Sequence, residues 1–283
     1  MTRLVALCAD DFGAAPSVCE GIVALAVAGR LAAVSCLVNA THWARAAPLL
    51  RGLPGQVDVG LHINLSEGPP LSAELARVWP QLPALPRLIA IAHLGLLPEP
   101  ALRAEVEAQL AVFSTTTGHA PRFIDGHQHV HHLPVVRAVL LDAVERMHPR
   151  PAVRNTGRVL GPGPGLKRVL IERTGGRALL RELIRRGIAH NAALTGVYAF
   201  KEPRYRLLMQ RWLAALPAEG ALLFCHPGVP SRALAEDPIS AARVREFNYL
   251  RGAEFSADLV AAGVALGRVW SAELRVGSRD SSI

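Results

Sequence analysis

Short apolar segments with strand-like composition alternate with helix-like segments along nearly the whole chain, and this alternation limits the folds open to it. The strand-like segments cover residues 3–9, 32–38, 57–65, 121–124, 151–154, 193–200, 220–225 and 267–270. Helix-like spacing of apolar residues marks residues 16–28, 43–50, 101–113, 134–147, 205–216, 241–252 and 256–263. We therefore predict a single α/β domain over residues 1–283, with a mainly parallel sheet or barrel and a loosely attached tail from about residue 274.

Ionisable side chains stand at the carboxyl ends of four of these strand-like segments. They are Asp10 and Asp11, His62, Asp125 with His127 and His129, and His226. Parallel strands deliver their carboxyl ends to a common rim, so we expect these side chains to converge. Each has an ordinary alternative when taken alone: a turn or helix cap for the aspartates, and a buried structural histidine for His62 or His226.

The stretch 123–134 is the most distinctive of these endings, because it holds four of the 11 histidines of the chain. They are His127, His129, His131 and His132. Imidazole is a common metal ligand and proton carrier. A strand-like segment precedes the stretch and a helix-like segment follows it, which places it where α/β folds gather their ligands. The alternative is a polar loop that is simply rich in histidine.

A mixed set of aspartate and histidine suits Zn²⁺ or another divalent transition metal, and carboxylates also suit Mg²⁺. Three protein ligands and an open position are typical of a catalytic metal site. Asp10 and Asp11 are adjacent and cannot point in the same direction. One of them can therefore bind a metal while the other accepts a proton.

The formal net charge of +8 raises the question of an anionic partner. Aromatic residues make up only 5% of the chain and no nucleic-acid motif is present, so no nucleic-acid partner is expected. Basic residues concentrate in a predicted amphipathic helix over residues 167–186, which is either a solvated face or a contact with an anionic or lipid surface. Residues 73–100 are apolar and interrupted by prolines, which fits a short packed helix, a lid or an apolar entrance.

The four cysteines show no paired spacing, and we expect reduced cytosolic thiols. The first residues lack the apolar core and cleavage site of a secretory signal, and no uncharged apolar stretch reaches the roughly 18 residues of a membrane span. We therefore predict a cytoplasmic protein, with peripheral contact at the inner membrane face left open.

Three motifs resemble those of the YdjC-like family of carbohydrate deacetylases. They are Ala9-Asp-Asp-Phe-Gly13, Gly60-Leu-His-Ile-Asn-Leu65 and Asp125-Gly-His-Gln-His-Val-His131, and His226-Pro-Gly is similar to a late element of the family. The resemblance spans about residues 3–270. It implies a distorted (β/α) barrel, one divalent metal ion (Zn²⁺ or Mg²⁺) and removal of acetyl from an N-acetylated sugar. By position, it implies that Asp11, His62 and His127 bind the metal and that Asp10 is the general base.

Other roles follow from this scheme. We expect His226, or alternatively His129, to protonate the leaving amine. Asp125 is expected to orient a histidine or contact the substrate, His129 to contact the substrate, and Arg154 to steady Asp10 or contact the substrate. An ordinary surface salt bridge is the alternative for Arg154.

The segments 226–232 and 245–250 are similar to the hopanoid-biosynthesis-associated (HpnK-type) branch of this family. This narrower resemblance implies a lipid-linked substrate, an N-acetylglucosaminyl hopanoid. The family resemblance also raises a homodimer as a prediction. The rival functions are deacetylation of soluble chitooligosaccharides, metal-dependent hydrolysis of another bond such as a phosphoester, and non-catalytic binding of a sugar or lipid.

Overall fold

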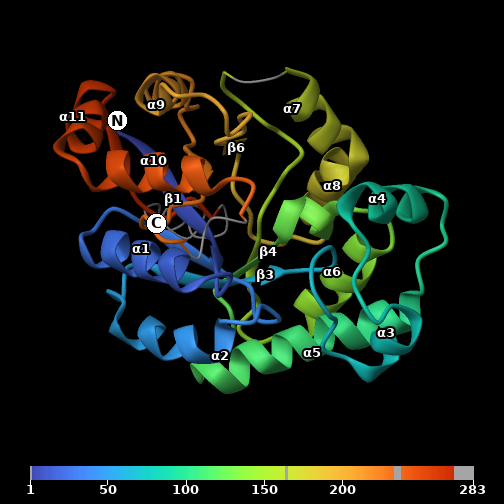
Figure 1. Ribbon diagram of the computed structural model, residues 1–283. Coiled ribbons are helices and arrows are strands. Elements are labelled where there is room, and N and C mark those ends of the chain that lie inside the picture. Colours follow the sequence, from blue (N-terminus) through green and yellow to red (C-terminus); the bar gives the residue numbers. More distant parts are fainter. Residues whose placement is uncertain (1, 163–164, 233–236, 271–283) are drawn as a thin grey trace, which may run out of the picture.

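The computed structural model describes residues 2–162, 165–232 and 237–270, and its centre is one sheet of eight strands surrounded by helices (Figure 1). The strands are β1 (Arg3–Phe12), β2 (Ala33–Cys36), β3 (Asp58–Ile63), β4 (Phe123–Gly126), β5 (Ala152–Val153), β6 (Leu194–Thr195), β7 (Ala221–Cys225) and β8 (Val264–Leu266). They lie in the order β5-β4-β3-β2-β1-β7-β6, and β8 pairs with β1. All the ladders between these strands are parallel in the described part of the chain.

Single backbone hydrogen bonds, rather than a ladder, join the segments that carry the edge strands β5 and β6. The amide of Val153 donates to the carbonyl of Ala189 over 2.8 Å, and the amide of Leu194 donates to the carbonyl of Arg158 over 2.9 Å. An isolated parallel bridge pairs Val159 with Leu194. The sheet therefore curls into an irregularly closed barrel, which confirms the predicted single-domain α/β fold and its distorted (β/α) barrel.

Helices cover the outside of this barrel (Figure 1). They are α1 (Pro16–Val27), α2 (Trp43–Ala46), α3 (Ala73–Val78), α4 (Leu85–His93), α5 (Glu99–Thr117), α6 (Val136–Arg146), α7 (Gly165–Ile171), α8 (Arg177–Arg185), α9 (Tyr205–Ala214), α10 (Ser240–Arg251) and α11 (Ala253–Ala261). Two 3₁₀ segments, η1 (Ala47–Gly52) and η2 (His127–His132), and a π segment, η3 (Glu172–Gly176), complete the set. The apolar region 73–100 thus contains α3, α4 and the start of α5.

The apolar interior consists of two clusters, one between the sheet and the surrounding helices and one inside the barrel, because both faces of a parallel sheet are covered. The larger cluster contains apolar side chains of the strands together with those of the surrounding helices. The smaller cluster includes Ala6, Cys8, Ala33, Phe123, Ala152, Leu194, Leu222, Phe224 and Trp270. The rings of Phe123 and Trp270 stack at 5.2 Å, and the Trp270 indole donates to Asp58, the first residue of β3. Trp270 therefore closes the amino end of the barrel and leaves the carboxyl end for the polar residues.

The predicted basic helix over residues 167–186 is not continuous. It is divided into α7 and α8 by the π segment η3, within which Gly175 has a φ of 154° that side-chain-bearing residues rarely adopt. Several of its arginines form ion pairs: Arg177 with Glu172, Arg185 with Glu182, and Arg186 with neighbouring acids of α6. This part of the region behaves as a solvated, charge-balanced surface.

Several strand boundaries also differ from the expected ones. Strand β6 covers only Leu194–Thr195 of the predicted residues 193–200. Strand β1 continues through Asp10 and Asp11 to Phe12, because an irregularity in its pairing with β2 accommodates one extra residue. The final strand, β8, covers Val264–Leu266 rather than residues 267–270, since the later residues leave the sheet to bring Trp270 beneath the barrel. The predicted tail from about residue 274 lies outside the described residues.

Candidate active site

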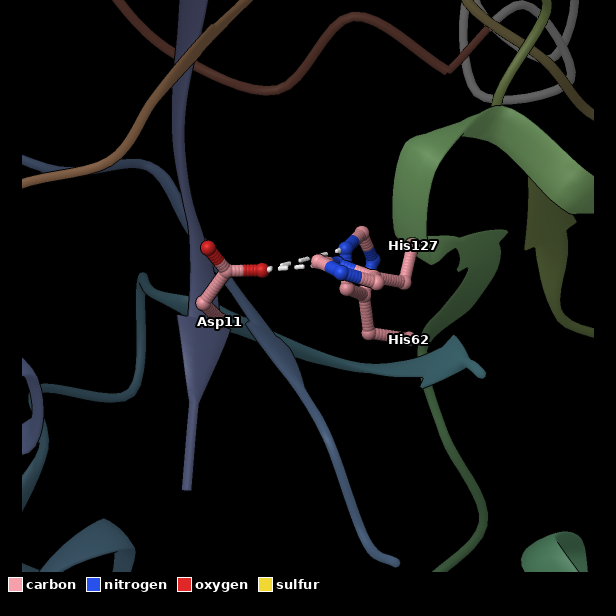
Figure 2. A group of neighbouring side chains, drawn as sticks. All are labelled: Asp11, His62 and His127. Carbon is pink, nitrogen blue, oxygen red and sulfur yellow. Dashed lines mark hydrogen bonds and ion pairs between the residues drawn. The ribbon is translucent and has the colours of Figure 1, made fainter. Parts of the chain in front are cut away.

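Asp11, His62 and His127 come together at the carboxyl ends of β1, β3 and β4 (Figure 2). The Asp11 Oδ1 atom lies 3.1 Å from His127 Nδ1 and 3.6 Å from His62 Nε2. One possible ligand atom from each residue lies within 4.8 Å of the others. The structure therefore assembles the three residues to which the family resemblance assigned the metal.

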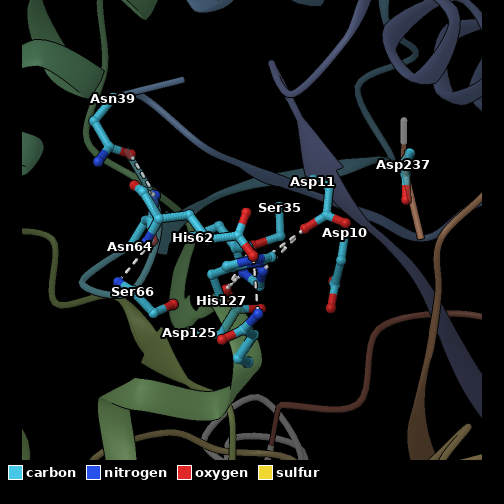
Figure 3. Close-up of polar contacts among 12 residues, drawn as sticks. Asp10, Asp11, Ser35, Asn39, His62, Asn64, Ser66, Asp125, His127 and Asp237 are labelled. Atoms are coloured by element: carbon cyan, nitrogen blue, oxygen red, sulfur yellow. Dashed lines mark hydrogen bonds and ion pairs between the residues drawn. The ribbon is translucent and has the colours of Figure 1, made fainter. Parts of the chain in front are cut away.

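A bulge in β1 separates the two adjacent aspartates. Ala9 pairs with Val34 and Phe12 with Cys36, so three steps along β1 match two along β2. Asp11 has a φ of 69°, a left-handed value that is uncommon outside glycine. The side chains of Asp10 and Asp11 consequently point in different directions from the strand (Figure 3).

His62 is held by a buried network that fixes which nitrogen faces Asp11 (Figure 3). His62 Nδ1 lies 2.5 Å from Asp125 Oδ1, and the Ser35 hydroxyl donates to the same oxygen over 2.5 Å. Because the Asp125 carboxylate accepts the Nδ1 proton, His62 Nε2 is left as the unprotonated nitrogen that a metal needs. Asp125 is therefore placed where it can orient His62, and that role stays a prediction.

Arg154 lies beneath the site, fully buried, and binds both aspartates of this network. It donates to the two oxygens of Asp10 over 2.7 and 2.6 Å and pairs with Asp125 Oδ2 at 2.5 Å. Arg154 is thus placed where it can steady Asp10, and that role stays a prediction. Its complete burial rules out the alternative of a surface salt bridge. Arg154 and Asp125 are both fully buried and do not line the cavity, so this placement speaks against the predicted direct contact with a substrate.

Arg243, on α10, is a buried residue of the site that the sequence did not indicate. Its Nη2 donates to Asp11 Oδ2 over 2.8 Å, and its Nε donates to Asp237 Oδ2 over 2.6 Å. Burial alone would raise the pKa of the Asp11 carboxyl, but the charges of Arg243 and His127 hold that pKa well below its usual value. Asp11 therefore remains ionised.

His127 begins the 3₁₀ segment η2, in which Gln128 and His129 have left-handed φ values of 52° and 63°. This tight turn directs the His127 ring toward Asp11 and places its Nε2 3.2 Å from Glu67 Oε1. Burial disfavours a charged ring, but the neighbouring Asp11 carboxylate outweighs it and raises the pKa of His127 to about 10 in the metal-free protein. A metal bound here would replace that proton.

Of the other three histidines of this stretch, His129 and His132 line the cavity and His131 does not. His129 lines the cavity, and burial holds its pKa well below the usual value. His131 Nε2 lies 3.0 Å from the Arg154 carbonyl, and His132 lies between the hydroxyls of Thr156 and Thr174 at 2.9 and 3.0 Å. Only His127 of the four therefore belongs to the three-residue cluster.

His226 follows β7 and lines the cavity beside the aspartates. Its backbone amide donates to Glu246 Oε2 over 2.5 Å, and its ring meets the Phe200 ring edge to face at 5.2 Å. Burial lowers the pKa of His226 to about 4, so the ring is neutral near pH 7. Burial also raises the pKa of Glu246 to about 7.

These residues form the floor of a cavity of about 560 Å³, and its walls are largely apolar. The floor includes Asp10, Asp11, His62, His127 and His226. Leu85 and Ile89 of α4 face it from one element, and Leu170 and Ile171 of α7 from another. In the part of the chain that is described, no helix combines the length and apolar character needed to cross a bilayer.

Comparisons with known proteins agree with the motifs. The family model for YdjC-like proteins matches residues 4–261. A mouse (Mus musculus) protein named carbohydrate deacetylase is 34% identical over 249 residues, which cover 81% of this chain and 79% of that protein. A human (Homo sapiens) protein of the same name is 40% identical over 151 residues, which cover 50% of this chain and 45% of that protein. A chitooligosaccharide deacetylase from Enterobacter sp. (strain 638) is 34% identical over 143 residues, which cover 48% of this chain and 53% of that protein.

A solved structure, titled as a putative cellobiose-phosphate cleavage protein from Enterococcus faecalis V583, has the same fold. It superposes with a TM-score of 0.74 over 95% of this chain and 98% of its own, at 17% sequence identity. At that identity the likeness shows the fold alone. The family model and the mouse relative together cover most of the chain, and they show that this chain belongs to the YdjC-like protein family.

Proposed function

We propose that this protein is a metal-dependent deacetylase that removes the N-acetyl group from an N-acetylglucosamine-type sugar. Water and the amide react to give the free amine and acetate. The observation that carries the proposal is the cluster of Asp11, His62 and His127 on a cavity floor, beside the separate carboxylate of Asp10, in a member of this family.

The donor set fits a divalent metal ion. Two imidazoles and one carboxylate are typical ligands of Zn²⁺, whereas Mg²⁺ prefers oxygen donors, so the residues favour Zn²⁺ between the two ions. Asp125 leaves His62 Nε2 unprotonated, as a ligand must be. When bound, the metal would polarise the acetyl carbonyl and lower the pKa of a water molecule.

Asp10 is the residue we assign as general base. It lines the cavity next to Asp11, and Arg154 fixes its carboxylate from below with two hydrogen bonds. A carboxylate held in one orientation can accept the proton of the attacking water without first reorganising. Arg154 thus acts through Asp10 and does not itself contact the substrate.

His226 is the residue we assign as general acid, because its ring lies on the cavity side of the site. Since burial lowers its pKa to about 4, the ring is neutral before the reaction. It must therefore first receive the proton that Asp10 takes from the attacking water, and it then gives that proton to the leaving amine. His129 remains the alternative. Its ring packs against Phe224 at 5.3 Å and against His132 at 6.3 Å, which restricts its movement toward the substrate.

The lining of the cavity favours a lipid-linked substrate over a soluble sugar. A bare oligosaccharide presents hydroxyl groups, which apolar walls cannot satisfy. Apolar side chains of α4 and α7 form much of the wall, together with Lys167 of α7. Leu94 and Leu96, which follow α4, and Leu166 in α7 are more than half exposed. We infer that these surfaces accept the apolar part of a lipid-linked N-acetylated sugar and contact the membrane peripherally. The N-acetylglucosaminyl hopanoid implied by the sequence is our candidate.

An acetate-release assay tests the function and its substrate together. Metal-loaded protein is incubated with an N-acetylglucosaminyl lipid in one arm and N-acetylated chitobiose in the other. We expect faster acetate release from the lipid, and loss of release in Asp11→Asn and His127→Ala proteins that retain the wild-type circular dichroism. Asparagine preserves the shape of Asp11 but not the charge that a metal ligand requires.

Each outcome distinguishes a rival function. Faster release from chitobiose would favour a soluble chitooligosaccharide, and binding of either compound without acetate would indicate a non-catalytic binding protein. Full acetate release by a metal-stripped Asp11→Asn protein would contradict a metal-dependent mechanism.

A further inference from the structure

Each of the two adjacent aspartates is held by its own buried arginine. Arg154 binds Asp10 with two hydrogen bonds, and Arg243 binds Asp11 with one. The two arginines approach from different parts of the barrel, since Arg154 follows β5 and Arg243 lies on α10. Arg154 has a role in the function proposed above, whereas Arg243 has none.

Arg243 occupies only one oxygen of Asp11. Its Nη2 lies 2.8 Å from Oδ2, while Oδ1 faces His127 Nδ1 at 3.1 Å and His62 Nε2 at 3.6 Å. The carboxylate is therefore divided between two partners. Oδ2 is engaged by the guanidinium, and Oδ1 is the atom turned toward the two imidazoles.

The other side of the guanidinium is also fixed. Arg243 Nε donates to Asp237 Oδ2 over 2.6 Å, and Asp237 stands with Ile239 on the cavity lining. Arginine presents its donors in a rigid planar fork, so holding Asp237 at Nε sets the direction in which Nη2 meets Asp11. Figure 3 shows Asp237 on the opposite side of Asp11 from His62.

The charges of the buried network add a second, independent argument. It contains the carboxylates of Asp10, Asp11, Asp125 and the partly buried Asp237, and the guanidiniums of Arg154 and Arg243. With His127 neutral, as a metal ligand must be, these groups formally leave two negative charges. Buried charge is costly unless it is compensated. A divalent cation at Asp11 would balance the network, which indicates that Arg243 is part of a structure built around the cation.

We propose that Arg243 is a positioning residue for the metal site, which holds Asp11 by Oδ2 so that Asp11 binds the metal through Oδ1 alone. This proposal rests on the proposed function, because it requires a metal at Asp11, His62 and His127. It predicts that Arg243 contributes to metal affinity through orientation, although its positive charge would by itself repel a cation.

Metal binding to the full-length protein measures this contribution directly. Chelator-stripped wild type and Arg243→Gln, Arg243→Lys and Arg251→Gln proteins are titrated with Zn²⁺ by calorimetry, with a competing chelator. We expect Arg243→Gln to weaken Zn²⁺ binding by about 10- to 100-fold, the usual effect of losing a partner of a metal ligand. Arg243→Lys keeps the charge but not the fork, so an intermediate loss is expected.

Arg251→Gln is the matched control, because Arg251 lies on the same helix and is exposed. Its guanidinium carbon lies 5.4 Å from the centre of the Phe247 ring, on its own helix. The Zn²⁺ affinity of Arg251→Gln is expected to equal that of wild type. Asp237→Asn supplies a second variant that retains the arginine but loosens its anchor, and a smaller loss than in Arg243→Gln is expected. Denaturant unfolding of the metal-free proteins shows how much stability each change removes.

Two results would overturn the assignment of Arg243. Unchanged or tighter Zn²⁺ binding by Arg243→Gln would mean that the arginine does not position the metal ligand and that its charge repels the cation. A loss of metal-free stability without a loss of Zn²⁺ affinity would mean that the arginine only fastens α10 to the barrel. Absence of Zn²⁺ and Mg²⁺ binding in the wild-type protein would instead overturn the proposed function on which the assignment rests.

Discussion

At the scale of single residues, the site depends on side chains that hold other side chains in one orientation. Asp125 accepts the Nδ1 proton of His62 and is itself bound by Ser35 and Arg154. Such a partner would not touch a metal bound at the proposed site, yet it decides which ring nitrogen is available as a ligand. Substitutions beneath the cavity floor should therefore affect metal binding.

Asp125→Asn tests this dependence. An asparagine side chain must turn its amide NH₂ toward either Arg154 or the Nδ1 proton of His62, and neither is an acceptor. We expect Zn²⁺ affinity to fall about 10- to 100-fold, measured by competition titration of metal-free protein. Ser35→Ala is the control, since it removes one hydrogen bond to Asp125 and should change affinity about fivefold or less. Equal affinities for both variants would contradict the role of Asp125.

The sequence indicated the site residues at the ends of strands better than it indicated the residues that hold those side chains in place. Asp11, His62 and His127 follow or end strand-like segments, and parallel strands bring such positions together. Arg243 lies in the first turn of α10, 232 residues from its partner Asp11, and no local pattern marks it. The only signal that could have found it is the excess of carboxylates at the site, which requires a buried cation.

At the scale of elements, the π segment η3 is the feature that brings α7 and α8 against the histidine-rich turn. Gly175 in this segment has a φ of 154°, and a Cβ atom at this position would lie 2.0 Å from the His132 carbonyl oxygen. The close approach holds η3 against η2, the turn that begins with His127. The break in the basic helix thus serves the packing of the active-site turn.

Gly175→Ala should therefore destabilise the protein by about 3 kcal/mol, through the forbidden backbone conformation and the clash with His132. Denaturant unfolding measures the effect. Gly52→Ala is a matched control, because Gly52 is exposed, has no left-handed φ, and would place its Cβ in open space. Similar unfolding midpoints for the two variants would show that η3 tolerates the shift.

The basic helix also shows why element boundaries were harder to predict than element types. Apolar spacing identified helical structure over residues 167–186, but spacing does not register a single π turn. The same limit applies to β1, where one extra residue in the bulge carries the strand past Asp10. In both cases the tertiary contact, and not the local periodicity, sets the boundary.

At the scale of the whole molecule, the interior holds histidines that are neutral at pH 7. Burial lowers the pKa of His131 to about 4, and it holds those of His129 and His132 well below their usual value. In the unfolded chain these residues protonate near pH 6.5. The unfolded state therefore binds more protons between these values, and the free energy of unfolding falls as the pH drops from about 6.5 toward 4.

A His131→Asn protein isolates this effect for one residue, because asparagine can still donate to the Arg154 carbonyl but does not titrate. We expect wild type to lose about 3 kcal/mol more stability than the variant between pH 7 and pH 4. Metal-free protein is unfolded with denaturant at several pH values. The comparison cancels the opposing contribution of His127, whose raised pKa stabilises the fold at low pH. Parallel pH profiles would contradict the buried neutral state of His131.

The overall architecture was predictable because strand-like and helix-like segments alternate, and only parallel sheets accommodate that order readily. The strand order was not predictable. Pairing of β1 with β7 and β8 joins residues far apart in the chain, and nothing in the sequence of β1 selects those partners over others. The irregular closure between β5 and β6 depends on single hydrogen bonds that leave no periodic trace.

The central position of β1 has a consequence for how the protein is made. The chain is synthesised from its amino end, so β1 emerges long before Ala221–Cys225 of β7, Arg243 and Val264–Leu266 of β8. Until then the apolar first strand keeps an open edge, and an open edge recruits other chains. A product terminated before these segments would therefore be an aggregation-prone fragment rather than a smaller enzyme, and Asp11 acquires its arginine only 232 residues later in the chain.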